Sequence, residues 1–250
     1  MIGETHGNTQ VINLTLEDVN MICWDYFEKC GGICGVNSSG TISNCSSTVN
    51  VTCGENPHAL GGLCGRNRST ISNCYATGNV TGGFSSSALG GLCGNNNSTV
   101  SNCYAKGSVI AGDDSERIGG LCGNNEGGTI SNCYATGVVD GNDYVGGLIG
   151  RDYDENGFFT KCFWDSDINP SLDGIGNSTD PNVIGKTTSE MLTESTFTNW
   201  DFSNVWAIYE KQVQSYPLLR QRVIGDLNCD RRVDMVDFAI FGGHWMEGVE

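Results

Sequence analysis

Residues 61–82 read GGLCGRNRSTISNCYATGNVTG, and this stretch decides the fold because the chain repeats it. It returns at residues 90–112 as GGLCGNNNSTVSNCYAKGSVIAG and at residues 119–141 as GGLCGNNEGGTISNCYATGVVDG. A more diverged copy, GGICGVNSSGTISNCSSTVNVTC, lies at residues 31–53, and another, GGLIGRDYDENGFFTKCFWD, begins at Gly146. Self-similarity at a period of roughly 20–50 residues is typical of solenoids, propellers and other repeat arrays.

Two series of cysteines set the period of the repeat. In one series, equivalent cysteines are 29, 29, 30 and 29 residues apart, and in the other they are 30, 29 and 29 residues apart. This nearly constant spacing indicates that each copy is one structural unit stacked on the next. The first series is Cys45, Cys74, Cys103, Cys133 and Cys162, and the second is Cys34, Cys64, Cys93 and Cys122.

Side chains alternate after each NC pair. From residue 74 to residue 80, the even positions hold Cys, Ala, Gly and Val, and the odd positions hold Tyr, Thr and Asn. A period of two predicts a strand, and the GG and N-x-S/T segments supply turns, so each copy is expected to form two or three short strands. The prediction is an all-β fold, a parallel β-solenoid of about five coils of ~29 residues. The alternative, a β-propeller, has larger blades of ~40–50 residues.

The sequence of the repeat also resembles that of a known family. The core GG[LI]CG-x-N followed by TISNCYATG is similar to the GLUG motif, a repeat of bacterial surface proteins, over about residues 11–165. The resemblance implies a secreted or cell-surface β-solenoid of the kind found in adhesins and beside the catalytic part of some large extracellular zinc peptidases. This chain departs from the pattern by placing Cys where many copies have Val or Ser.

Charge argues against two classes of partner. The 250 residues include 13 basic and 29 acidic side chains, a formal net charge of −16, which repels nucleic acid and anionic membranes. Seven acids fall in residues 31–150 and seventeen in residues 151–250. No apolar run approaches the ~20 residues that a membrane-spanning helix requires. We therefore expect neither a nucleic-acid partner nor a membrane span.

The start of the chain resembles the middle of a repeat. Residues 1–10 contain neither a basic start nor the apolar segment of an export signal. Residues 11–22 already alternate, and Leu14 occupies the position that Cys45 occupies one coil later. Either an export signal and a capping coil precede Met1 in the natural protein, or the chain is a processed fragment, and we favour the first. We expect the protein to be secreted or held on a bacterial cell surface.

The thirteen cysteines allow three interpretations. Equivalent residues of stacked coils lie ~4.8 Å apart, but their parallel Cβ vectors disfavour a disulfide within one series. Free thiols that act as small buried hydrophobes are the favoured prediction. Disulfides between the two series, for instance Cys64 with Cys74, are a second interpretation, and metal or cluster binding is a third. The zinc signal is poor because no C-x-x-C occurs and the three histidines are far apart.

The repeats are predicted to have no catalytic activity. Enzymes that cleave polysaccharides need paired carboxylates on one face, whereas the outward positions here are Ser, Thr, Asn and Tyr. HExxH and G-x-S-x-G motifs are absent from the sequence. Tyr75, Tyr104 and Tyr134 recur at one position and predict an aromatic stripe. That stripe either stabilises the packing between coils or binds a glycan or protein ligand.

The repeat pattern ends near residue 162, which gives predicted domains of 1–162, 163–222 and 223–250. The middle segment is rich in turns, contains a capping box at Thr187 and Glu190, and ends in an aromatic cluster between Phe197 and Leu219. An open solenoid end exposes core and unpaired strands, so we expect residues 163–222 to cover it.

The last segment predicts a calcium site. From Asp226 the chain reads DLNCDRRVDMVD, with oxygen side chains at the spacing of an EF-hand loop and a backbone carbonyl at position 7. The segment resembles a dockerin repeat, which implies a calcium-stabilised module that docks onto a cohesin-like or cell-envelope partner. The predicted Ca²⁺ ligands are Asp226, Asn228, Asp230, Arg232 (through its carbonyl), Asp234 and Asp237.

Two departures weaken the calcium prediction. Arg231 stands where the loop expects Gly, at a cost on the order of 1 kcal/mol, and with Arg232 it places two cations beside the ion. A dockerin also has two such repeats, whereas the chain contains one. The alternative is an acidic tail that binds no ion.

Two functions follow from the sequence. The first is a non-catalytic extracellular structural or adhesive protein with a calcium-binding docking or tethering module at its C-terminus. The second is a fragment of a larger secreted hydrolase, acting on peptides or polysaccharides, whose catalytic domain is absent from this chain.

Overall fold

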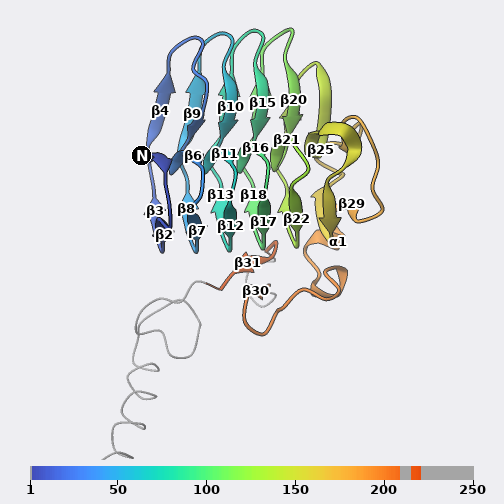
Figure 1. Ribbon diagram of the computed structural model, residues 1–250. Helices are drawn as coiled ribbons and strands as arrows, with labels where there is room; N and C mark the ends of the chain where they lie inside the picture. Colours follow the sequence, from blue (N-terminus) through green and yellow to red (C-terminus); the bar gives the residue numbers. More distant parts are fainter. Residues whose placement is uncertain (1, 209–214, 221–250) are drawn as a thin grey trace, which may run out of the picture. The chain divides into compact units, whose positions relative to one another are not determined.

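The computed structural model describes residues 2–208 and 215–220. The chain divides into two compact units, residues 1–198 and 199–250. The first unit contains a parallel β-solenoid, in which strands of successive coils lie side by side (Figure 1). One of its sheets has six strands, one from each coil, so the solenoid has about six coils instead of the five predicted.

Each of the first four coils contains five short strands. The second coil consists of β6 (Cys34–Asn37), β7 (Thr41–Ser43), β8 (Ser46–Ser47), β9 (Asn50–Cys53) and β10 (His58–Gly61). The prediction of two or three strands per copy is therefore wrong. The sequence shows the GG pair as a turn, but it does not show how many additional corners divide the rest of the coil.

The additional corners are residues with positive φ. Between β7 and β8 the chain turns at Asn44, with φ of 53°, and the equivalent Asn73 has φ of 52°. Just inside β10 and its equivalent β15, the corner residues are Ala59 and Ala88, with φ of 59° and 58°. Asparagine adopts the left-handed region more easily than most residues, which explains the SN before Cys45, Cys74, Cys103 and Cys133. Before Cys162 the corner residue is Lys161, with φ of 50°.

The strands of successive coils stack into four parallel sheets, in register along the solenoid. Cys64 pairs with Cys93 and Thr70 with Thr99, so equivalent residues of neighbouring copies are in contact. The largest sheet is, in spatial order, β1 (Ile2–Thr5), β6, β11 (Cys64–Asn67), β16 (Cys93–Asn96), β21 (Cys122–Asn125), β25 (Asp143–Asp152), β20 (Glu116–Gly119), β15 (Ser87–Gly90), β10 and β5 (Cys30–Gly31).

The other three sheets use the remaining strands of each coil. The first is β2 (Gln10–Ile12), β7, β12 (Thr70–Ser72), β17 (Thr99–Ser101), β22 (Thr129–Ser131) and β26 (Phe158–Thr160). The second is β3 (Thr15–Leu16), β8, β13 (Tyr75–Ala76), β18 (Tyr104–Ala105), β23 (Tyr134–Ala135), β27 (Cys162–Asp165) and β29 (Val183–Lys186). The third is β4 (Asn20–Cys23), β9, β14 (Val80–Gly82), β19 (Val109–Ala111) and β24 (Val139–Asp140).

Parallel pairing continues past residue 162. β25 pairs with both β20 and β21, because two strands that are separate in earlier coils are continuous there. β28 (Asp173–Ile175) then pairs with β25, and β29 pairs with β27. The segment predicted to cover the end of the solenoid thus begins by adding two more strands to it.

The interior is divided into two apolar columns. One contains the two cysteine series with Ile and Leu side chains, and the other contains Val and Leu residues such as Val80 and Leu89. The columns are separated where the second glycine of a GG pair (Gly62, Gly91 or Gly120) meets the alanine of a YA strand. A Cβ on Gly91 would lie 2.8 Å from the Cβ of Ala105 and 2.3 Å from the carbonyl oxygen of Gly120. Only glycine fits at this narrow point of the cross-section.

A buried asparagine ladder runs along the solenoid. The Nδ2 of Asn37 donates to Oδ1 of Asn67 (2.9 Å), and the same bond joins Asn67 to Asn96 (2.9 Å) and Asn96 to Asn125 (2.8 Å). All four side chains are buried, and Asp152 ends the ladder by accepting from Asn125 (3.4 Å). Each amide supplies both a donor and an acceptor, so one residue type satisfies every step of the ladder.

All twelve cysteines of the described residues are buried and free. In the Cys34 series each thiol donates to a carbonyl two residues ahead, as Cys93 does to Asn95 (3.0 Å). In the Cys45 series each thiol donates to a carbonyl two residues back, as Cys103 does to Ser101 (3.1 Å). The ladder thiols are therefore satisfied inside the core without bridging, as the favoured prediction required.

The rest of the first unit packs near the last coil. Helix α1 (Thr188–Met191) begins with the predicted capping box, in which Thr187 and Glu190 bond each other's backbone N–H groups. Met191 is fully buried, and the Phe197 ring packs edge-on against Phe163 with centroids 5.1 Å apart. Two 3-10 helices, η1 (Tyr153–Glu155) and η2 (Glu194–Thr196), complete this region.

The second unit is small in the part that the structure describes. β30 (Trp206–Ala207) and β31 (Leu218–Leu219) pair antiparallel, and the rings of Trp200 and Trp206 lie with centroids 4.4 Å apart. The guanidinium of Arg220 donates to the carbonyl of Trp206 (2.8 Å). Among the described residues, no helix has the length and apolar character needed to cross a membrane.

Candidate functional site

The predicted calcium loop falls outside the described residues. All six of its ligands belong to residues 221–250, so the calcium site remains a prediction from the sequence. They are Asp226, Asn228, Asp230, Arg232, Asp234 and Asp237.

The aromatic stripe forms, but it is largely buried. The rings of Tyr75 and Tyr104 stack with centroids 4.8 Å apart, and those of Tyr104 and Tyr134 with centroids 5.0 Å apart. Only 3% of Tyr104 and 0% of Tyr134 is exposed to solvent. A sugar ring needs an open aromatic face, and these two rings do not offer one. The stripe therefore stabilises the packing between coils. The alternative hypothesis, that these stacked rings bind a glycan, is wrong for Tyr104 and Tyr134.

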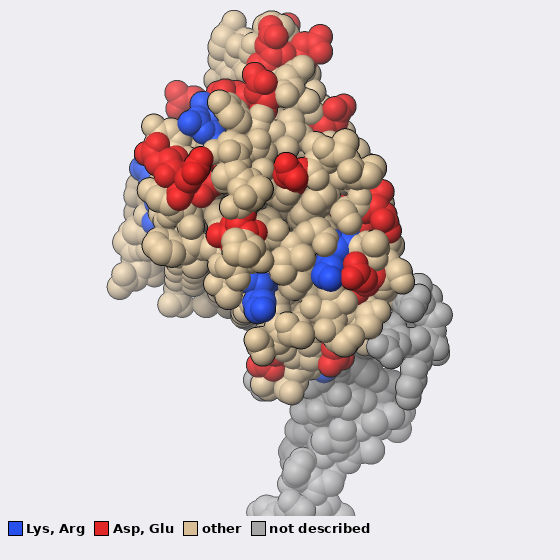
Figure 2. Space-filling view, turned by 90° about the vertical axis from the view of Figure 1, so that its right-hand side faces the viewer, with Lys and Arg blue, Asp and Glu red and all other residues tan. Residues whose placement is uncertain are grey.

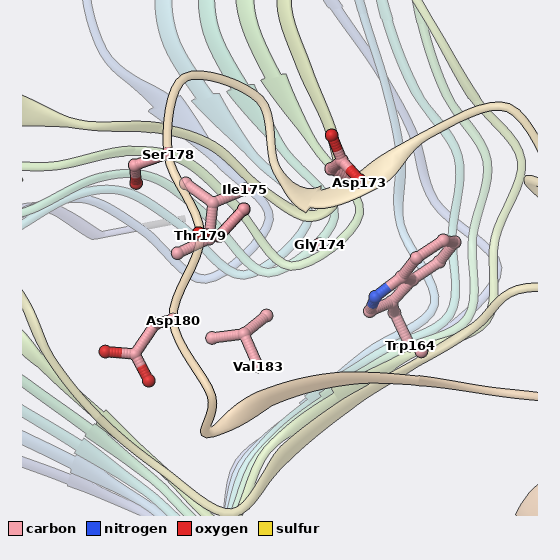
Figure 3. Close-up of a pocket in the computed structure, with 9 residues that line it drawn as sticks. Trp164, Asp173, Gly174, Ile175, Ser178, Thr179, Asp180 and Val183 are labelled. Atoms are coloured by element: carbon pink, nitrogen blue, oxygen red, sulfur yellow. The ribbon is translucent and has the colours of Figure 1, made fainter.

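A small hollow lies at the last coil, between β28 and β29 (Figure 3). It has a volume of about 180 Å³, below the ~300–1,000 Å³ usual for ligand pockets. The indole nitrogen of Trp164 points into the space beside Ile175 and Val183 (Figure 3). Asp173 and Asp180 stand at opposite sides and do not converge on a common point (Figure 3). The hollow therefore lacks the paired carboxylates that hydrolysis of a glycosidic bond requires.

The end of the solenoid near β25 is acidic (Figure 2). Acidic side chains are spread over this face, while few basic ones are visible (Figure 2). Exposed acids in this region include Asp143, Asp154, Glu155, Asp167 and Asp173. An acidic surface of this kind repels polyanions.

A cluster of sulfur atoms, which the sequence did not predict, lies in the first two coils. The Sγ atoms of Cys23, Cys30 and Cys53 are all within 4.8 Å of one another. Cys23 and Cys30 are 2.7 Å apart, and the Sγ of Cys30 is 3.1 Å from the Sδ of Met21. We call these four residues the sulfur cluster. Hydrogen bonds from the other two thiols lower the pKa of Cys23, and the bond to Cys23 raises the pKa of Cys53.

The sequence contains a signal for this cluster. Its three cysteines belong to neither the Cys34 series nor the Cys45 series. Cys23 and Cys53 are 30 residues apart and pair in register, but later coils do not continue them, and Cys30 pairs with Leu60. Cysteines that form no long series are the ones to examine for a local role. The approach of Cys30 to Cys23 was not predictable because these residues lie on different strands, joined by a loop whose path the repeat pattern does not define.

The fold and its surfaces define a parallel β-solenoid repeat protein. Three segments match the model of the family described as the GLUG motif, at residues 56–81, 85–110 and 114–140. The chain therefore carries GLUG motif repeats, and these repeats form the solenoid. The match is narrower than the predicted span of residues 11–165, because the first and last copies have diverged. Neither the curated proteins nor the solved structures searched give a match to this chain.

Proposed function

We propose that the protein is a non-catalytic extracellular spacer or adhesive element, secreted or held on a bacterial cell surface. The continuous stack of parallel strands from β1 to β29 carries this proposal. Its buried asparagine ladder and hydrogen-bonded thiols are devices that hold coils in register and bind nothing outside the core. A solenoid stabilised by contacts between neighbouring coils extends along one direction, which suits a spacer.

The adhesive part of the proposal rests on one regular outward surface. Along the sheet that contains β12, threonines stack as Thr41, Thr70 and Thr99, and serines stack beside them as Ser43 and Ser72. These side chains are half-buried, and they form two rows of hydroxyl groups at the spacing of the strands. Such an array offers repeated hydrogen bonds to a glycan or a protein ligand. Binding of the full chain on a glycan array, lost after Thr70→Val with Thr99→Val, would support it.

The C-terminal segment is proposed to bind Ca²⁺ and to dock the protein onto a cohesin-like or cell-envelope partner. Five oxygen side chains and one carbonyl at the spacing of a calcium loop support this proposal. Calcium would order the loop, because it neutralises carboxylates that otherwise repel one another. The acidic sequence from residue 151 onward favours cation binding but does not select calcium by itself.

Isothermal titration of the full chain with Ca²⁺ tests the docking module. We expect heat for one site, and its loss in the double variant Asp226→Asn with Asp230→Asn. The matched control is Asp113→Asn with Asp114→Asn, because these two exposed acids lie in a solenoid loop and outside the predicted calcium loop. Equal heats for both variants, or no heat at millimolar Ca²⁺, would exclude the calcium module. Binding of a cohesin-type domain in Ca²⁺ and not in chelator would then test docking.

The second candidate is a fragment of a larger secreted hydrolase. The resemblance of the repeats to those beside extracellular zinc peptidases favours it. In that case the solenoid serves as a spacer for a catalytic domain encoded upstream. Reading the source DNA upstream of Met1 separates the two candidates.

A further inference from the structure

The sulfur cluster is not a product of the repeat. In register, Met21 lies beside Val51, and later coils hold valine at this position. Cys30 lies beside Leu60, which is followed by leucine and isoleucine in the next coils. Continuing the same register, Gly82 and Ala111 follow Cys23 and Cys53. Positions that hold aliphatic residues or glycine in other coils thus hold sulfur-containing residues at this one place.

The replacement is coordinated across two coils. Met21, Cys23 and Cys30 belong to the first coil, and Cys53 belongs to the second. Random drift of a repeat would scatter such changes, whereas here three thiols lie within 4.8 Å of one another and the Met21 thioether lies 3.1 Å from one of them. The ladder cysteines differ, because each donates to a backbone carbonyl and belongs to a series of four or five cysteines that continues through successive coils. The sulfur cluster therefore needs an explanation other than packing.

We propose that the sulfur cluster binds one monovalent copper ion, Cu(I). Three thiols and a thioether are soft ligands, and thiolate with thioether ligands select Cu(I) over hard cations. The set has no imidazole and no oxygen ligand. Zinc sites are built from Cys, His and carboxylate, so the thioether favours copper over zinc. Thiols that bind as thiolates release their protons to solvent.

The geometry requires only a small rearrangement. Sulfur atoms bound at ~2.3 Å around one ion lie no more than ~4.6 Å from each other, close to the 4.8 Å limit within which the three thiols fall. Cys23 and Cys30 must separate by about 1 Å from their 2.7 Å contact to reach the spacing of two ligands on one ion. In the loop between them Trp24 is 84% exposed and Tyr26 is 72% exposed, so these two large side chains are not packed in the core where they would oppose such a shift.

The site also has an entry path and a structural purpose. Cys23 is 7% exposed and Cys53 is 4% exposed, so the cluster lies just below the surface. β4 and β5 each form the edge of their sheet among the described strands. An ion held by ligands from β4, β5 and β9 would join the first coil to the second at this edge. The inference does not depend on the calcium module or on the proposed function.

The test is titration of the reduced full chain with Cu(I) under anaerobic conditions, in competition with a chromophoric Cu(I) chelator. We expect one equivalent bound, a rise in the thermal unfolding temperature, and an X-ray absorption spectrum with sulfur as the only nearest neighbour of copper. Cys30→Leu and Cys53→Ala should each weaken binding by at least about 100-fold, because removing a ligand should exceed the 10–100-fold cost of losing a supporting residue. Both variants should fold, because other coils have leucine (Leu60) and alanine (Ala111) at the positions equivalent to Cys30 and Cys53.

The control is Cys103→Ser, which removes a thiol of the Cys45 series and should keep the full affinity. Equal loss of copper in this control, or nitrogen or oxygen neighbours in the absorption spectrum, would overturn the proposal. Tighter binding of Zn²⁺ than of Cu(I) would overturn the assignment of copper. A Cys23–Cys30 disulfide, found by peptide mapping after the thiols are trapped in the producing cells, would overturn the metal site itself.

Discussion

The asparagine ladder offers the sharpest test of how the coils are held together. We consider the substitution Asn96→Ala, which removes a fully buried amide in the middle of the solenoid. The Asn96 side chain makes four hydrogen bonds. Its Nδ2 donates to Asn125 Oδ1 (2.8 Å) and to the Ser98 carbonyl (3.0 Å), and its Oδ1 accepts from Asn67 Nδ2 (2.9 Å) and from the Ser98 N–H (3.3 Å).

The four bonds differ in what their loss costs. The two bonds to neighbouring asparagines are buried, so water cannot replace them, and each loss costs roughly 1–2 kcal/mol including the stranded acceptor on Asn125. Asn67 keeps two other acceptors, the carbonyls of Ser69 and Thr99, which limits the cost on that side. The two bonds to half-buried Ser98 add about 0.5 kcal/mol each. We expect the free energy of unfolding to fall by about 4 kcal/mol, a large part of the ~5–15 kcal/mol typical of a domain.

Urea unfolding followed by circular dichroism and by tryptophan fluorescence measures this change, provided that the two transitions coincide. The matched control is Asn79→Ala, which removes an exposed asparagine whose Oδ1 accepts from the Ser108 N–H (2.9 Å). Water can replace that bond, so the control should lose less than about 1 kcal/mol. A loss for Asn96→Ala no larger than that of the control would refute the reasoning that the ladder stabilises the stack.

Three further predictions test the packing, the end of the ladder and the thiols. Gly107→Ala should destabilise the fold by more than about 3 kcal/mol or prevent folding, because its Cβ would lie 1.9 Å from the carbonyl oxygen of Gly78 in the preceding coil; thermal unfolding measures this. Burial raises the pKa of Asp152, so the folded state favours its protonated form, and stability should fall as pH rises from ~3.9 to that raised pKa. Asp152→Asn should remove this loss and be more stable than the native chain at pH 7, as urea unfolding across pH would show. Burial raises the pKa of Cys122 to about 12, so iodoacetamide at pH 8 should modify it only after denaturation, as peptide mass analysis would show.

Each of these predictions has a control or a contrary outcome. Gly3→Ala should be neutral, since nothing lies within 4 Å of the Cβ it would add. The difference in the free energy of unfolding between Asp152→Asn and the native chain should vanish below the usual aspartate pKa. A difference that stays constant across pH would contradict the assignment of this loss of stability to ionisation of Asp152. Rapid labelling of folded Cys122 would show that the core admits reagent.

The period and the side-chain alternation were enough to predict a parallel solenoid with its cysteines inside. Repeats of ~29 residues place equivalent side chains in contact in neighbouring coils, so the ladders follow from the spacing alone. The sequence also indicated the capping box at Thr187, because that motif depends only on residues three apart. These features are local or periodic, and a single sequence carries both kinds of information.

The path of the chain within one coil was decided only by the tertiary structure. The GG pairs were interpreted as turns, but the second glycine is required because Ala105 approaches Gly91 across the interior. The tyrosine rings were expected on an exposed face, yet Tyr104 and Tyr134 are buried. The sulfur atoms of Cys23 and Cys30 meet because their coil bends between two strands. Contacts of this kind cross the coil between positions that no fixed spacing relates, so they depend on corners that form only when all the coils pack together.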